Sequence, residues 1–98
     1  MIQGHRTKTL QPYDKLLRAF KYFDALDEVL KRPFNPVVIV SMLDELVHRD
    51  GVRSALANRD ENTLEPLLVF LHKYISNPKY SSRLIDVSNI LLGINLLM

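Results

Sequence analysis

A helical apolar stripe between Leu64 and Ile75 constrains the fold of this chain more than any other stretch. Its apolar residues recur at the i, i+3, i+4, i+7 spacing of one helix face, and Phe70 widens that face. They are Leu64, Leu67, Leu68, Leu71, Tyr74 and Ile75. Only a narrow polar stripe remains opposite, so other elements must cover most of this helix. The pattern predicts the central helix of an all-helical domain.

Cap and proline signals place the ends of this helix and the start of the next. An Asn62-x-x-Glu65 capping box would begin it and would leave Pro66 within the tolerated first turn. Asn77-Pro78 then repeats the device of a cap followed by Pro and predicts the start of a last helix. The apolar residues of that helix are Tyr80, Leu84, Ile85, Val87, Leu91 and Ile94.

The same signals divide the first half of the chain. Asn35-Pro36 predicts a helix that runs to about His48, although its β-branched residues 37–40 alone could suggest a strand. A short helix should follow Gly51 and pack through Val52, Ala55 and Leu56.

Two apolar series lie upstream of Asn35. Pro12 would open a helix that buries Tyr13, Leu16, Leu17 and Phe20, and the second series is Phe23, Leu26, Val29 and Leu30. The pattern allows one bent helix or a hairpin with a very tight turn, and we favour the hairpin. Pro33 should end it, because Pro disfavours helical geometry in the residue before it.

These elements predict an all-α fold, a compact array of about five to six short helices without a sheet. With 98 residues there is room for one domain. Residues 1–11 lack apolar periodicity, so we assign them to a basic linker or tail that joins an upstream segment. Residues 12–98 form the expected helical domain.

The charge distribution is uneven. Residues 1–21 carry five basic side chains against Asp14 alone, a net +4, although the whole chain is only +2. The absence of Cys excludes a disulfide framework and a thiolate nucleophile, and no apolar run approaches the roughly 20 residues that span a bilayer.

Catalytic patterns are missing from the sequence. His5, His48 and His72 lie on three different predicted elements, without the spacing of a zinc site. The paired acids Asp27-Glu28 and Asp44-Glu45 lie on predicted solvated faces. We therefore predict no enzyme, no cofactor, no metal and no small-molecule substrate.

Two surfaces are candidates for a protein partner. Val69 lies beside His72 and Lys73 in the polar stripe of the central helix, where a core role fits poorly. The C-terminal residues Leu92, Ile94, Leu96 and Leu97 form an uncharged apolar tail. This tail either folds back onto the core or docks onto helices of a partner.

An RNA-binding module is the alternative function. Its phosphate contacts would come from the basic residues Arg6, Lys8, Lys15, Arg18 and Lys21. Aromatic residues of the kind that stack on bases are not interleaved with them, which favours the protein-assembly hypothesis.

Several ordered segments carry a family resemblance between about Tyr13 and Leu92. They are Tyr13-Asp14-Lys15-Leu16-Leu17, Phe23-Asp24-Ala25-Leu26-Asp27, Leu43-Asp44-Glu45-Leu46-Val47, Arg59-Asp60-Glu61-Asn62-Thr63-Leu64-Glu65-Pro66-Leu67-Leu68, Lys73-Tyr74-Ile75-Ser76-Asn77-Pro78-Lys79-Tyr80 and Leu84-Ile85-Asp86-Val87. The series resembles the C-terminal domain of the family of U three small nucleolar RNA-associated protein fifteen. None of these segments is catalytic.

That resemblance implies a nucleolar ribosome-biogenesis factor of the small-subunit processome, which acts in pre-rRNA processing and is linked to rDNA transcription. It implies an upstream WD-repeat propeller, absent from this sequence, through which pre-rRNA would mainly be contacted. The implied partners are the helical C-terminal domains of sister subunits in the same early subcomplex. No single RNA-binding residue follows from it.

Overall fold

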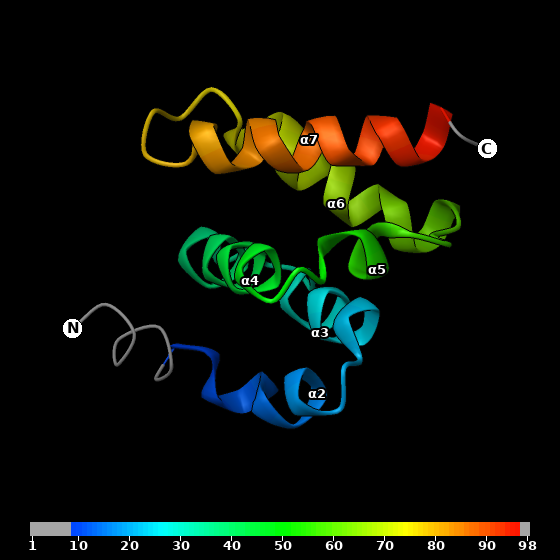
Figure 1. Ribbon diagram of the computed structural model, residues 1–98. Coiled ribbons are helices and arrows are strands. Elements are labelled where there is room, and N and C mark those ends of the chain that lie inside the picture. The colour runs from blue at the N-terminus through cyan, green and yellow to red at the C-terminus, as the bar shows by residue number, and fades with distance from the viewer. Residues whose placement is uncertain (1–8, 97–98) are drawn as a thin grey trace.

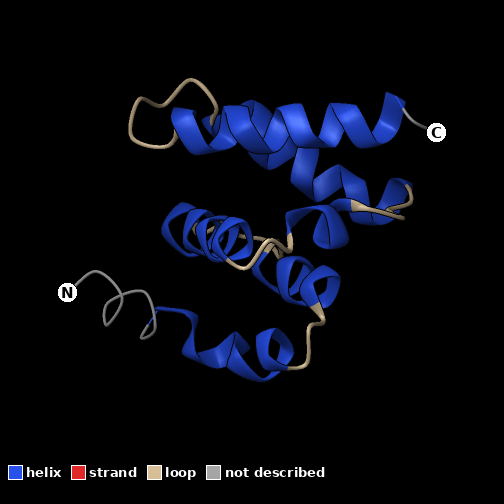
Figure 2. Ribbon diagram, viewed as in Figure 1, coloured by secondary structure: helices blue, strands red, loops and turns tan. Residues whose placement is uncertain are grey.

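Six α-helices and one short 3-10 turn make up the regular structure of residues 9–96, the part of the chain described by the computed structural model (Figure 1, Figure 2). Side chains are described for residues 9–94. The elements are η1 (Gln11–Tyr13), α2 (Asp14–Arg18), α3 (Tyr22–Val29), α4 (Pro36–His48), α5 (Val52–Leu56), α6 (Glu61–Tyr74) and α7 (Ser81–Leu96). No strand occurs within residues 9–96, so the predicted all-α class is confirmed.

The helices stack in layers, with α2 at one end and α7 at the other (Figure 1). α3 contacts α2, α4 and α5, while α7 contacts α4, α5 and α6. α6 packs chiefly against α7, so it is not the central helix that the pattern predicted.

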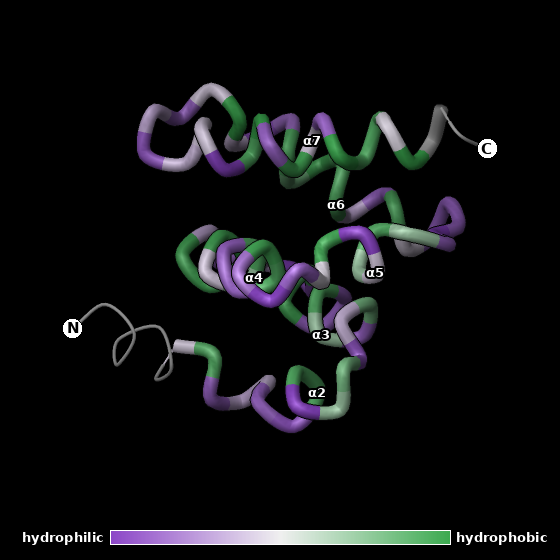
Figure 3. The backbone as a smooth tube through the Cα atoms, viewed as in Figure 1, coloured by the Kyte–Doolittle hydropathy of each residue, from purple (hydrophilic) through white to green (hydrophobic). Residues whose placement is uncertain are grey.

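The core is built from apolar residues of every helix, because each helix contributes the face that its periodicity defines. Figure 3 shows hydrophobic and hydrophilic positions alternating in short stretches along the helices. The fully buried side chains include Leu26, Ile39, Met42, Leu43, Leu46, Leu56, Leu67, Phe70, Leu84 and Val87. Leu10, which lies in the segment assigned to the linker, is also buried in this core.

The predicted cap of α4 is confirmed, but the cap of α6 is not. The Asn35 side chain accepts a hydrogen bond from the Val38 N–H, and Pro36 begins the helix. α6 begins two residues earlier than predicted, because Asp60 and Thr63 form the capping box. The Thr63 N–H donates to Asp60 Oδ1 at 2.9 Å, and the Asp60 N–H donates to Thr63 Oγ1 at 3.0 Å. Pro66 consequently lies inside the helix and not in its first turn.

The start of the last helix also differs from the prediction. Asn77 closes a turn, since its side chain accepts from the Lys79 N–H and its carbonyl accepts from the N–H groups of Tyr80 and Ser81. α7 begins only at Ser81. A short polar side chain that accepts a hydrogen bond from the amide two residues ahead favours a turn. The bond to Asn77 therefore stabilises a turn at the position where the sequence predicted the first residues of the helix. Ile85, one of the apolar residues of this helix, is exposed on the outer side of α7.

A tight turn separates α2 from α3, as the hairpin interpretation requires. The Phe20 N–H bonds the Leu17 carbonyl and the Lys21 N–H bonds the Leu16 carbonyl, which is the Schellman pattern of a helix end. Phe20 occupies the left-handed position with φ 59°. This conformation turns its side chain to solvent, so Phe20 is 74% exposed and its predicted burial is wrong.

Arg59 fastens α6 to two other helices. Its guanidinium donates to the carbonyl oxygens of Ala55 on α5, Thr63 on α6 and Phe23 on α3. It also pairs with Asp27 Oδ1 at 3.0 Å and stacks 4.1 Å from the centre of the Phe23 ring. The side chain is 1% exposed, and its planar fork is suited to serving several acceptors at once.

Replacement of Arg59 by Ala should lower the free energy of unfolding by about 3 kcal/mol, because three carbonyl oxygens and Asp27 lose their donor. Urea unfolding followed by circular dichroism measures this change. Arg53 is the control, because it is exposed on neighbouring α5 and its replacement by Ala should change stability by less than about 0.5 kcal/mol. Equal effects of the two substitutions would contradict the role of Arg59.

The α6 cap should make stability depend on pH. Hydrogen bonds from the backbone and then the side chain of Thr63 favour the charged carboxylate and hold the Asp60 pKa below its ordinary value of 3.8. A lowered folded-state pKa means that this contribution is complete above the unfolded value. It is lost as the pH falls through the folded-state pKa.

Replacement of Asp60 by Ala should therefore lower the Tm near neutral pH, because the Thr63 N–H loses its acceptor. The Tm difference from the wild type should shrink below pH 3.8 as the wild-type carboxylate protonates. Thermal melts over this pH range measure it. The Asp60→Asn variant keeps an acceptor without titrating, so the Tm difference between the Asn and Ala variants should stay constant over this pH range. A pH-independent Tm difference for the Ala variant would contradict the carboxylate cap.

Candidate functional site

One side of α6 is covered by the fold and the other faces solvent. Leu67, Phe70 and Leu71 are buried, because they lie on the side that packs into the core. The outward residues follow helical spacing, and we call them the α6 surface: Glu61, Glu65, Leu68, Val69, His72 and Lys73. Leu68 is 47% exposed and Val69 is 37% exposed, so the centre of this surface is apolar. The predicted burial of Leu68 is wrong.

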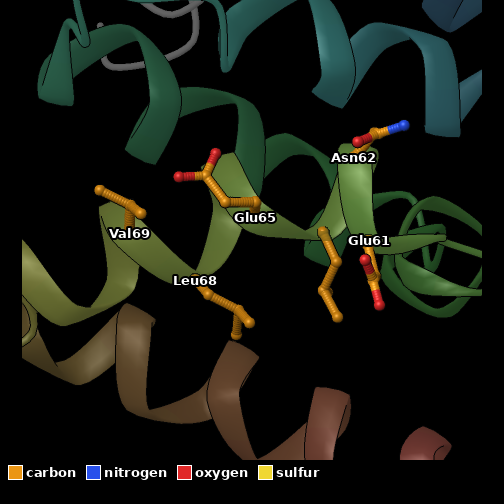
Figure 4. A pocket seen from close by; sticks show the side chains of 6 residues that line it. Glu61, Asn62, Glu65, Leu68 and Val69 are labelled. Atoms are coloured by element: carbon orange, nitrogen blue, oxygen red, sulfur yellow. The ribbon is translucent and has the colours of Figure 1, made fainter.

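A first hollow of about 580 Å³ lies along the N-terminal half of this helix. It is lined by Glu61, Asn62, Leu64, Glu65, Leu68 and Val69. In Figure 4, Leu68 points towards the ribbon of α7, whereas Glu65 and Val69 point away from it. The hollow therefore combines aliphatic side chains with two carboxylates.

A second hollow of about 600 Å³ lies between α6 and the loop that precedes α4. It is lined by Arg32, Pro33, Phe34, Val69, Lys73 and Tyr74. Val69 lines both hollows, which makes it the link between the acidic N-terminal half of the α6 surface and a more basic C-terminal half.

Aromatic contacts fix the walls of the second hollow. The rings of Phe34 and Phe70 meet edge to face at 5.6 Å, and the ring of Tyr74 lies 4.9 Å from that of Phe70. Arg32 donates two hydrogen bonds to the Glu65 carboxylate, at 2.8 and 3.0 Å. The loop is thus attached to α6 by both apolar and ionic contacts.

Lys73 provides a free cation at the edge of the second hollow. Its ammonium lies 5.6 Å from the centre of the Tyr74 ring, and in the described part of the chain no carboxylate is within ion-pair distance of it. His72 is exposed beside it. The structure thus brings together Val69, His72 and Lys73, the three residues predicted on this helix.

The other predicted partner residues lie on α7. Leu92 is 58% exposed, whereas Ile94 is partly buried against the core. The side chain of Leu96 and the whole of Leu97 lie outside the described residues. Of the two alternatives for the tail, Ile94 follows the first, because it packs onto the core, while Leu92 stays exposed and its docking onto a partner stays a prediction.

The predicted RNA-contacting residues are not gathered in one hollow. Lys15 is exposed, and Arg18 forms an ion pair with Asp14 at 2.8 Å. Lys21 lines a hollow between η1, α2 and α3 whose charged wall is otherwise acidic, formed by Asp24, Asp27 and Glu28. Arg6 and Lys8 lie outside the described residues.

Two contributors to the α6 surface were missed by the sequence analysis. Leu68 fitted the apolar stripe, and its exposure depends on how far α7 reaches around the helix. Arg32 reaches Glu65 from 33 residues away, and nothing local in the sequence signals that pairing. The only local signal for Glu65 was its place on the polar stripe.

The titratable groups of residues 9–94 form no metal-binding cluster. No group of three or more His, Cys, Asp or Glu residues there could hold a metal ion. The pKa of Arg49 is raised, chiefly by its hydrogen bond to Glu45, and that of Asp60 is lowered by the helix cap. Both shifts have structural causes. The helices within residues 9–96 are too short or too polar for any of them to cross a bilayer.

Comparison with known proteins confirms the resemblance that the segments indicated. A family model described as UTP15 C terminal matches residues 1–95. U3 small nucleolar RNA-associated protein 15 of Schizosaccharomyces pombe is 47% identical over 93 residues, which cover 95% of this chain and 19% of that protein.

Vertebrate relatives agree. The homologue from Xenopus tropicalis is 40% identical over 87% of this chain, and the one from Mus musculus is 36% identical over 98% of it. The matched regions are 17% and 19% of those two proteins, so the chain spans about a fifth of the length of these curated relatives. The chain belongs to the family of UTP15 C-terminal domains.

Proposed function

We propose that this chain is a noncatalytic helical assembly domain of a ribosome-biogenesis factor that acts with the U3 small nucleolar ribonucleoprotein. The names of its relatives, which describe U3 small nucleolar RNA-associated proteins, support that setting. The expected location is the nucleolus, within the small-subunit processome. Residues 12–98, together with Leu10, would be the assembling unit, and residues 1–11 would lead to the remainder of the protein.

The α6 surface is the observation that carries this proposal. α6 is covered on one side only, and Leu68 and Val69 remain exposed between two hollows. Apolar centres with charged margins are typical of protein interfaces, and a partner helix can lay its apolar face between such walls. The exposed Leu92 on α7 adds to the apolar area offered to a partner.

Helical C-terminal domains of sister subunits are the proposed partners. Such a domain presents amphipathic helices, and the α6 surface provides aliphatic contacts at Leu68 and Val69 with carboxylates at Glu61 and Glu65. Lys73 adds an unpaired cation at the opposite end of this surface. The proposed interface needs shape and charge complementarity and no reacting group.

Replacement of Val69 by Glu should weaken co-purification with the helical C-terminal domains of the sister subunits by about tenfold or more. The physical reason is that a carboxylate introduced where the two hollows meet would lose its hydration when a partner helix covers that point, whereas the aliphatic side chain of Val69 gains from the same burial. Co-expression followed by affinity purification and quantification of the bound domains measures the effect.

The Val37→Glu variant is the matched control. Val37 is 47% exposed on α4 and lines neither hollow of the α6 surface, so the same substitution there should leave assembly intact. Thermal melts of both variants verify that they fold. Equal assembly by both variants would refute the α6 interface. If the full-length protein formed the complex unchanged after deletion of this domain, the assembly function itself would be refuted.

A further inference from the structure

Phe20 is the most exposed large hydrophobic residue in the described part of the chain. It lies in the turn between α2 and α3, at the end of the molecule opposite α7 (Figure 1). Most of the other exposed hydrophobic residues, Leu68, Val69, Ile85 and Leu92, lie on α6 and α7. The ring of Phe20 is therefore separate from the α6 surface.

The backbone at Phe20 favours a different residue. A φ of 59° is the left-handed conformation, which Gly adopts freely and which strains a residue with a Cβ atom. The two Schellman hydrogen bonds of the turn hold it there. A Phe at this position gains little burial in exchange, since 74% of it stays exposed.

A rigid support lies under the exposed ring. The Phe20 and Tyr22 rings meet edge to face, with 6.0 Å between centroids and 86° between planes. Tyr22 is buried and packs against Gly51, where an added Cβ would lie 2.5 Å from a Tyr22 ring carbon. The Phe20 side chain is thereby positioned on one side while most of its surface stays open to solvent.

Charged residues surround this ring in the sequence. Lys15, Arg18 and Lys21 are exposed within five residues of it, and within residues 9–94 an ion pair joins Arg18 to Asp14 but none is formed by Lys15 or Lys21. The acidic neighbours lie on α3, where Asp24, Asp27 and Glu28 line the same hollow as Lys21. A protein-binding hot spot usually lies inside a desolvated apolar patch, whereas the other exposed large hydrophobic residues within residues 9–94 lie on α4, α6 and α7. The backbone hydrogen bonds of the turn hold the segment from Lys15 to Lys21 together, and an open ring in a basic segment matches the way proteins bind single-stranded nucleic acid.

We propose that Phe20 is a stacking platform for a base of single-stranded RNA, with Lys15 and Lys21 contacting the adjacent phosphates. The site is independent of the α6 surface and of the proposed assembly function. The acidic groups Asp14 and Asp24 limit its electrostatic attraction, so we expect non-specific affinity, with a Kd in the range of about 10⁻⁴ to 10⁻⁶ M at physiological salt.

The chain contains no Trp, so Phe20→Trp introduces a single indole as a reporter of stacking. The probe is a fluorescein-labelled single-stranded oligoadenylate of 12 nucleotides for anisotropy, and the same strand without label for indole emission. The Trp variant should bind with affinity near that of the wild type, and its emission should be quenched at saturation. The Phe20→Leu variant should bind about fivefold to a hundredfold more weakly, because an aliphatic side chain cannot stack on a base.

Two further variants separate binding from folding. Phe20→Gly suits the left-handed backbone, so its Tm should equal or exceed that of the wild type while its RNA affinity falls as for Phe20→Leu. Leu92→Ala removes another exposed apolar side chain and should leave RNA affinity unchanged. Lys21→Ala should weaken binding and reduce its dependence on salt concentration.

Three outcomes would overturn this proposal. These are unchanged affinity of Phe20→Leu, unquenched indole emission at saturation, and a Phe20→Leu defect that is confined to assembly with the sister subunits. The third outcome would identify Phe20 as a protein contact. Because Val69→Glu tests assembly and Phe20→Leu tests RNA binding on opposite sides of the molecule, failure of either proposal is distinguishable from failure of the other.

Discussion

The buried guanidinium of Arg59 determines where α6 lies, and the candidate site depends on that position. One side chain serves carbonyl oxygens from three helices, so α3, α5 and α6 cannot shift relative to one another without leaving an acceptor or a buried charge unpaired. A second link, from Arg32 to Glu65, ties the loop before α4 to the middle of α6. The two arginines therefore set the orientation in which Leu68 and Val69 face solvent.

The two proposed surfaces differ in the chemistry of their side chains. The α6 surface combines exposed aliphatic groups with fixed carboxylates and a free ammonium, and this combination favours a folded partner of complementary shape. The turn at Phe20 combines one open ring with exposed basic side chains, and this combination favours a flexible polymer of phosphates and bases. The turn lies at the α2 end of the helix stack, whereas α6 lies next to α7, so the two surfaces are on separate elements (Figure 1).

Helix identity could be predicted from the sequence because the apolar periodicity of each segment is a local property. The start of α4 at Asn35-Pro36 and the packing of α5 through Val52, Ala55 and Leu56 follow from such local signals, and both are confirmed. Periodicity gives the angular position of a residue on its helix, but the arc that neighbours cover depends on tertiary packing. Leu68 was placed in the core for this reason, and the pairing of Arg32 with Glu65 was missed for the same one. The exposure of Phe20 follows from the left-handed backbone conformation of the turn, which a hydropathy pattern does not describe.

The contact between Tyr22 and Gly51 joins two turns that are 30 residues apart. Each turn contains a residue in the left-handed conformation, Phe20 in one and Asp50 in the other. The next residue closes the helix end, because the Lys21 N–H donates to the Leu16 carbonyl and the Gly51 N–H donates to the Leu46 carbonyl. Opening of either turn removes packing from the Tyr22 ring, which lies between them. The two turns should therefore open as one cooperative unit. The amide protons of Lys21 and Gly51 would then exchange with solvent through the same local unfolding event, which makes the α2–α3 and α4–α5 corners a single element of the protein's dynamics.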